Sequence, residues 1–129
     1  MNRVLILSVC CALLASMVGG CAMSFAMRDA EGYRQATRDL LASKRGAIET
    51  CYAAQASVDA SLVGSVVVNF EVAAETGDVS KAAVDAAQST APAAVQACVV
   101  DALADLSLEL PDQRTGQATF TYEFGTRQL

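Results

Sequence analysis

Gln117-Ala118-Thr119-Phe120-Thr121-Tyr122-Glu123-Phe124 is the stretch with the clearest structural pattern in this chain of 129 residues. Apolar and polar residues alternate along it, which is the signature of a β-strand with one apolar face. One face would carry Ala118, Phe120, Tyr122 and Phe124, and the other Thr119, Thr121 and Glu123. Residues 117–124 are therefore predicted to form a strand of a sheet that is buried on one side.

A second alternating stretch lies earlier, at residues 62–73. Val66, Val68, Phe70 and Val72 alternate there with more polar positions, which predicts another strand with one apolar face. The residues after it, Glu75-Thr76-Gly77-Asp78, are typical of a turn, because Gly77 can adopt a positive φ. A further strand, about residues 79–86, is expected to return antiparallel.

Two segments show helical periodicity. Residues 24–55 are predicted to form one helix, firm from about Gly32, with its basic residues on a solvated face (Arg34, Arg38, Lys44 and Arg45). A later helix is predicted with Ser89 or Thr90 as its N-cap and Pro92 in its first turn. Its apolar stripe comprises Val95, Cys98, Val99, Ala102, Leu103 and Leu106.

The predicted order of elements is helix, strand, strand, helix, strand. Strands with one apolar face suit an antiparallel sheet whose other face meets solvent. The chain is therefore predicted to be an α+β two-layer sandwich, with a small antiparallel sheet and its helices on one face.

The N-terminus resembles a bacterial lipoprotein signal. Arg3 precedes an apolar run that ends in Val18-Gly19-Gly20-Cys21, and Cys21 would receive the lipid. This divides the chain into a signal peptide at 1–20, a short lipid-anchored tether at 21–28 and a domain at 29–129. Two alternatives stay open: cleavage after Ala26 by an ordinary secretory pathway, and an uncleaved membrane anchor from Val4 to Met27.

The lipoprotein interpretation predicts an address in the cell envelope, facing the periplasm, with the membrane contacted through the lipid. Ala22 favours the outer membrane over the inner one. A net charge of −5 without a clustered basic patch argues against nucleic acid as a partner. The oligomeric state stays open.

The five cysteines divide into groups. Cys10 and Cys11 would leave with the signal peptide, and Cys21 would carry lipid. Cys51 and Cys98 then remain as an even pair in an oxidising compartment, which predicts a structural disulfide. With no histidine and no recognisable catalytic motif, we expect neither a metal site, nor a cofactor, nor an enzyme.

Several motifs together resemble the TonB-like C-terminal domains of the AgmX/PglI gliding-motility type. They are Ile48-Glu49-Thr50-Cys51-Tyr52, residues 64–70, Gly77-Asp78-Val79, residues 95–99 and residues 120–124. The resemblance covers about residues 47–124 and implies a TonB-like fold with the same disulfide. Two features depart from the family: Leu110-Pro111-Asp112 replaces its Phe-Pro-x-Pro, and the chain has almost no proline-rich spacer.

These observations predict a non-enzymatic protein-interaction module of the envelope. The last strand could accept an extended partner segment by strand addition, with Thr119, Thr121 and Glu123 flanking the contact. The same polar residues could instead simply blunt the strand edge. Alternatives are a structural subunit of an envelope, motility or transport complex, and a relative of the TonB-type energy transducers with an uncleaved anchor.

Overall fold

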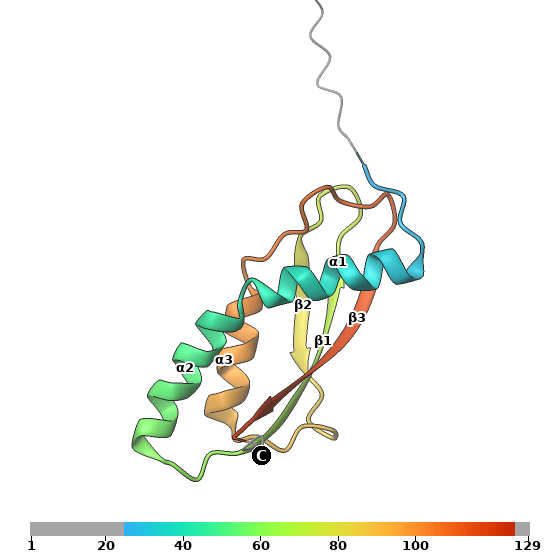
Figure 1. Ribbon diagram of the computed structural model, residues 1–129. Coiled ribbons are helices and arrows are strands. Elements are labelled where there is room, and N and C mark those ends of the chain that lie inside the picture. Colours follow the sequence, from blue (N-terminus) through green and yellow to red (C-terminus); the bar gives the residue numbers. More distant parts are fainter. Residues whose placement is uncertain (1–24, 126–129) are drawn as a thin grey trace, which may run out of the picture.

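The computed structural model describes residues 25–125 (Figure 1). The predicted signal peptide and the lipidation site at Cys21 lie outside the described residues. In chain order the elements are α1 (Ala30–Ala42), α2 (Arg45–Val58), β1 (Gly64–Val72), β2 (Val79–Val84), α3 (Ala93–Leu103) and β3 (Gly116–Phe124). The predicted α+β class and the predicted order of helices and strands are confirmed.

The three strands form one antiparallel sheet in the order β2-β1-β3. The pairing of β1 with β3 is regular along its whole length, from Gly64 opposite Phe124 to Val72 opposite Gly116. The three helices gather on one face of the sheet, with α1 crossing the sheet and α2 lying beside α3 (Figure 1). The result is the two-layer arrangement expected from strands with one apolar face.

The core lies between the sheet and the helices. The alternation predicted for β3 is observed, because residues 118, 120, 122 and 124 are buried or half-buried while residues 117, 119, 121 and 123 are exposed. The side chains with almost no exposed surface come from β1, α3 and α1: Val66, Val68, Val72, Val95, Val99, Leu103 and Leu41. The core is therefore built mainly from valine and leucine on facing layers.

The single helix predicted over residues 24–55 is wrong, because the chain forms two helices there. The Ser43 hydroxyl donates to the Leu40 carbonyl oxygen at 2.6 Å, and the Lys44 amide bonds to Leu41, three residues back. A serine that competes for helix carbonyls in this way favours a break. The break lets α1 cross the sheet while α2 runs along α3 (Figure 1).

The predicted N-cap of the second helix is also wrong. α3 begins at Ala93 after Pro92, and no side chain caps it. The Ser89 and Thr90 hydroxyls instead accept hydrogen bonds from the amides of Val67 and Ser65, each at 2.9 Å. These two side chains extend the pairing of β1 beyond the end of β2, which stops at Val84 rather than near residue 86.

The hairpin between β1 and β2 turns where the sequence predicted. Gly77 has a φ of 74°. A Cβ atom on Gly77 would collide with the carbonyl oxygen of Leu108. The glycine is therefore required both by the backbone conformation and by the close approach of the chain that follows α3.

A disulfide joins Cys51 on α2 to Cys98 on α3, the pair expected from the sequence. The two Cα atoms lie 5.7 Å apart. Cys98 is buried and Cys51 is half-buried, so the bond lies at the inner side of the two packed helices. It joins two cysteines that are 47 residues apart in the chain.

Candidate functional site

Strand β3 forms a free edge of the sheet in the part of the chain that the structure describes. Val67 of β1 lies opposite Thr121 of β3. The Val67 carbonyl accepts from the Asp85 amide at 2.8 Å, and its amide donates to the Ser89 hydroxyl. In an antiparallel ladder, opposed residues either exchange both backbone hydrogen bonds or neither. Both backbone groups of Val67 are bonded to residues 85 and 89, on the side of β1 away from β3. The backbone groups of Thr121 therefore point away from β1.

Alternation along the strand extends this orientation to four positions. Their backbone N–H and C=O groups face the free edge: Gln117, Thr119, Thr121 and Glu123. This set contains all three residues predicted from the sequence to flank a partner. Their side chains are exposed on the sheet face opposite the helices, where the Thr119 hydroxyl donates to the Asn69 side-chain oxygen at 2.6 Å.

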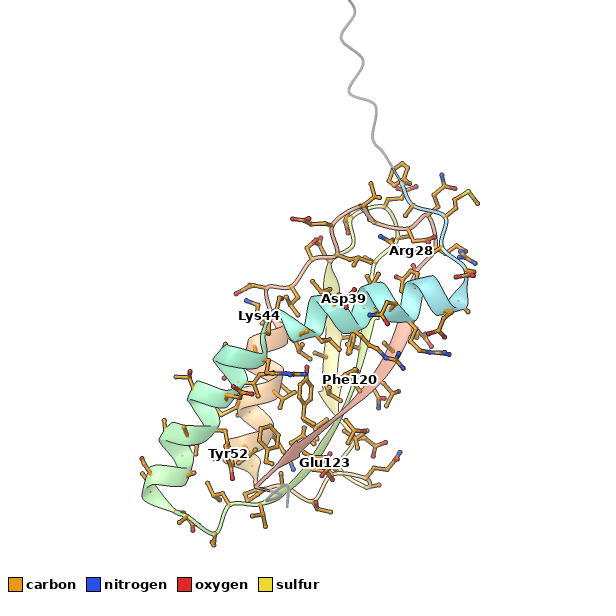
Figure 2. The ribbon with its side chains drawn as sticks, viewed as in Figure 1. Arg28, Asp39, Lys44, Tyr52, Phe120 and Glu123 are labelled. Carbon is orange, nitrogen blue, oxygen red and sulfur yellow. A yellow bond between two sulfur atoms is a disulfide. The ribbon has the colours of Figure 1, made fainter. Side chains whose placement is uncertain are left out.

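A groove of about 780 Å³ runs between α1 and the free edge of β3. Ala118 and Phe120 lie along it on the helix side, and the Tyr33 ring lies against Gly116 at one end. Thr119 and Thr121 also line the groove, whereas Glu123 does not. Figure 2 shows Glu123 at the end of β3 far from Arg28, with Phe120 between them.

Every charged side chain that lines the groove is an arginine. Arg34 and Arg38 project from α1, and Arg114 lies just before β3. Glu31 approaches the first two, at 2.6 Å from Arg34 and 4.0 Å from Arg38. All three arginines keep more than half of their side-chain surface exposed, so a bound molecule could reach them.

One end of the groove is fixed by Asp112, a buried carboxylate. It accepts the Arg28 amide at 2.9 Å and the Arg114 amide at 3.2 Å, and the Arg114 side chain at 3.4 Å. The hydrogen bond from Arg28, together with those from Arg114, lowers the pKa of Asp112. Asp112 therefore holds the segment before α1 against the loop before β3.

The neighbouring backbone strengthens this junction. The Ala26 amide donates to the Pro111 carbonyl at 2.9 Å, and the Arg28 guanidinium donates to the Leu110 carbonyl at the same distance. The sequence placed Asp112 only in a loop. Its one signal was that Leu110-Pro111-Asp112 departs from the motif of the TonB-like family.

Two tyrosines, Tyr33 in the groove and Tyr122 on β3, have raised pKa values because they are withdrawn from water. Burial is the largest cause for both Tyr33 and Tyr122. The Tyr122 hydroxyl is buried and finds no hydrogen-bond partner among residues 25–125. Its ring packs near Phe120, with 5.2 Å between the ring centroids. Tyr122 thus contributes to the packing beneath β3 rather than to a polar site.

Within residues 25–125, no group of three or more histidine, cysteine or acidic side chains is arranged to hold a metal ion. None of the helices over this part of the chain has the length and apolar character needed to span a bilayer.

Comparisons with protein-family models, with curated proteins and with solved structures find no match to this chain. The TonB-like assignment thus stays a hypothesis that rests on the sequence motifs. Over residues 25–125 the chain is an α+β domain whose three-stranded sheet ends on one side in β3, with the groove between that strand and α1.

Proposed function

We propose that this chain is a non-enzymatic envelope lipoprotein whose domain binds a partner protein by strand addition at β3. The observation that carries the proposal is the free edge of β3, where four residues direct their backbone groups outward beside a groove. An extended segment laid along such an edge gains main-chain hydrogen bonds, and side-chain contacts beside the strand supply specificity.

The other edge of the sheet is less suited to this role. β2 has only six residues, and its pairing with β1 is interrupted between Asn69 and Glu71. At this irregularity Lys81 has a φ of 55°, and its amino group pairs with Glu71 at 3.0 Å. A short strand with a bulge and a lysine is how proteins discourage pairing at an edge. β3 has nine residues in unbroken register, so strand addition is favoured there.

The proposed location rests on Cys21 as a lipidation site. Phe25 follows Cys21 by four residues, and the next residues are bonded to the loop before β3. A lipid on Cys21 would therefore hold the start of β3 near the membrane. An intact mass for residues 21–129 with added acyl chains is expected, and an unmodified mass for residues 1–129 would contradict this part of the proposal.

Crosslinking in living cells tests the binding mode. A photoreactive residue at Thr119 should capture an envelope protein, whereas the same residue at Ser80 on β2 should not. The capture at Thr119 should be lost in Thr121→Pro, which lacks the outward N–H group, and kept in Thr121→Val, which retains it.

Capture that is equal at the two edges, or that survives Thr121→Pro, would contradict strand addition at β3. If assembly with a partner also persists when residues 117–124 are disrupted, the chain is a structural subunit that binds through its helices.

A further inference from the structure

We infer that the segment bound at β3 is acidic, an extended stretch of a partner protein with glutamate or aspartate side chains directed toward α1. This inference rests on the proposed strand addition and specifies the chemistry of the partner. Its basis is the lining of the groove, whose charged residues are Arg34, Arg38 and Arg114.

This lining differs from the rest of the protein. The chain has 14 acidic and 9 basic residues, which gives a net charge of −5. A basic segment would be attracted to the acidic surface in general, without preference for the groove. An acidic segment is repelled by the molecule as a whole and attracted only where arginines gather, so the groove gives it both register and specificity.

The positive charge of the two arginines on α1 is only partly neutralised by neighbouring carboxylates. Arg34 and Arg38 are four residues apart, so they lie on the same side of the helix. They share one carboxylate, Glu31, which lies 2.6 Å from the first and 4.0 Å from the second. Two guanidinium groups facing one carboxylate leave a positive charge that a ligand carboxylate can approach in the forked geometry arginine favours.

Arg114 adds a third positive group at the start of β3. Its side chain bonds to Asp112 at 3.4 Å and to the Arg28 carbonyl, yet about two-thirds of its surface stays exposed. The three arginines therefore reach the groove from both of its walls. An added strand alternates its side chains, and the set directed toward α1 meets Phe120 and the two helix arginines.

Peptide binding to the full chain in detergent, followed by fluorescence anisotropy, tests the inference. The first probe is a synthetic peptide of the same length as β3 that alternates valine with glutamate. The second alternates valine with lysine. The third is the glutamate peptide with an N-methyl group on every backbone amide, so that it has no N–H group to donate to β3. We expect the glutamate peptide to bind about tenfold more tightly than the lysine peptide at low salt.

Variants of the exposed arginines test whether these residues cause the preference for the glutamate peptide. Arg34→Gln with Arg38→Gln should weaken binding of the glutamate peptide about tenfold, which corresponds to about threefold for each exposed charge pair. The control Lys81→Gln removes one charge from an exposed ion pair at the other edge and should change binding by less than about twofold. Arg34→Glu with Arg38→Glu should reverse the preference in favour of the lysine peptide. Circular dichroism checks that each variant is folded.

The outcomes separate the two proposals. Equal binding of glutamate and lysine peptides, with loss on N-methylation, would leave strand addition standing and overturn the acidic partner. Binding that N-methylation does not affect, or no binding of either peptide up to about 1 mM, would overturn strand addition and this inference with it. A dimer that dissociates when the peptide is added would assign the edge to a second copy of the chain and also overturn the inference.

Discussion

Removal of the disulfide between Cys51 and Cys98 should cost this domain a large part of its stability. The bond closes a loop with a sequence separation of 47 residues. The chain-entropy relation for a loop of this length gives about 4 kcal/mol at 25 °C. Domains of this size are stabilised by only about 5 to 15 kcal/mol, so the variant should be close to the limit of folding.

Urea unfolding of the full chain, followed by circular dichroism, measures this effect. Cys51→Ala with Cys98→Ala should lower the free energy of unfolding by about 4 kcal/mol and the melting temperature by about 20 °C. The wild type in a reducing agent should match the variant, and the variant itself should not respond to the reducing agent. A loss below about 1 kcal/mol would contradict a stabilising role for the disulfide, because the packing of α2 on α3 would then hold without the crosslink.

Three further substitutions test other parts of the structure. In the folded state the pKa of Asp112 is lowered, so its stabilising effect is present above the unfolded pKa of about 3.9 and is lost as the pH falls through the folded value. Asp112→Asn should therefore melt at a lower temperature than the wild type at pH 7, with a difference that shrinks toward pH 2; a constant difference would contradict this role. Gly77→Ala should cost about 2 kcal/mol in urea unfolding, because alanine disfavours the positive φ and its Cβ would meet Leu108; a neutral result would place the turn in another conformation. Tyr122→Phe removes a buried hydroxyl without a partner among the described residues and should raise the free energy of unfolding by about 1 kcal/mol, whereas a loss of that size would reveal a hydrogen bond to that hydroxyl.

The strands could be predicted from the sequence because the alternation of apolar and polar residues within each strand shows which side chains are buried. Successive side chains of a strand face opposite sides, so the alternation in residues 117–124 translated directly into one buried and one exposed face. Gly77 could be assigned for a similar reason, since a turn of this kind needs a residue that tolerates a positive φ.

The two wrong predictions, the unbroken first helix and the N-cap of the second, concern places where tertiary contacts determine the local structure. Ser43 breaks the first helix by bonding to Leu40, although the apolar stripe continues across the break. Ser89 and Thr90 have the chemistry of N-caps, but the unpaired amides of β1 compete for their hydroxyls. Helical periodicity and capping preferences are local patterns, so they cannot predict which strand will lie beside these side chains.

The groove was only partly predictable. The sequence singled out Thr119, Thr121 and Glu123, and the register of β3 on β1 directs their backbone groups to the free edge. It assigned Arg34 and Arg38 to a solvated helix face and gave no role to Arg114. Arg114 lies about eighty residues from the other two arginines in the chain, and the packing of α1 beside β3 brings all three to one groove.

Amide hydrogen exchange along β3 is the most direct test of strand addition at the free edge. In the isolated full chain, the amides of Ala118, Phe120 and Tyr122 should exchange slowly because they face β1, while those of Thr119, Thr121 and Glu123 should exchange fast. With the valine–glutamate peptide bound, the fast amides should become protected. If they stay fast while the peptide is bound, the peptide does not add a strand to β3, which would contradict the proposed binding mode.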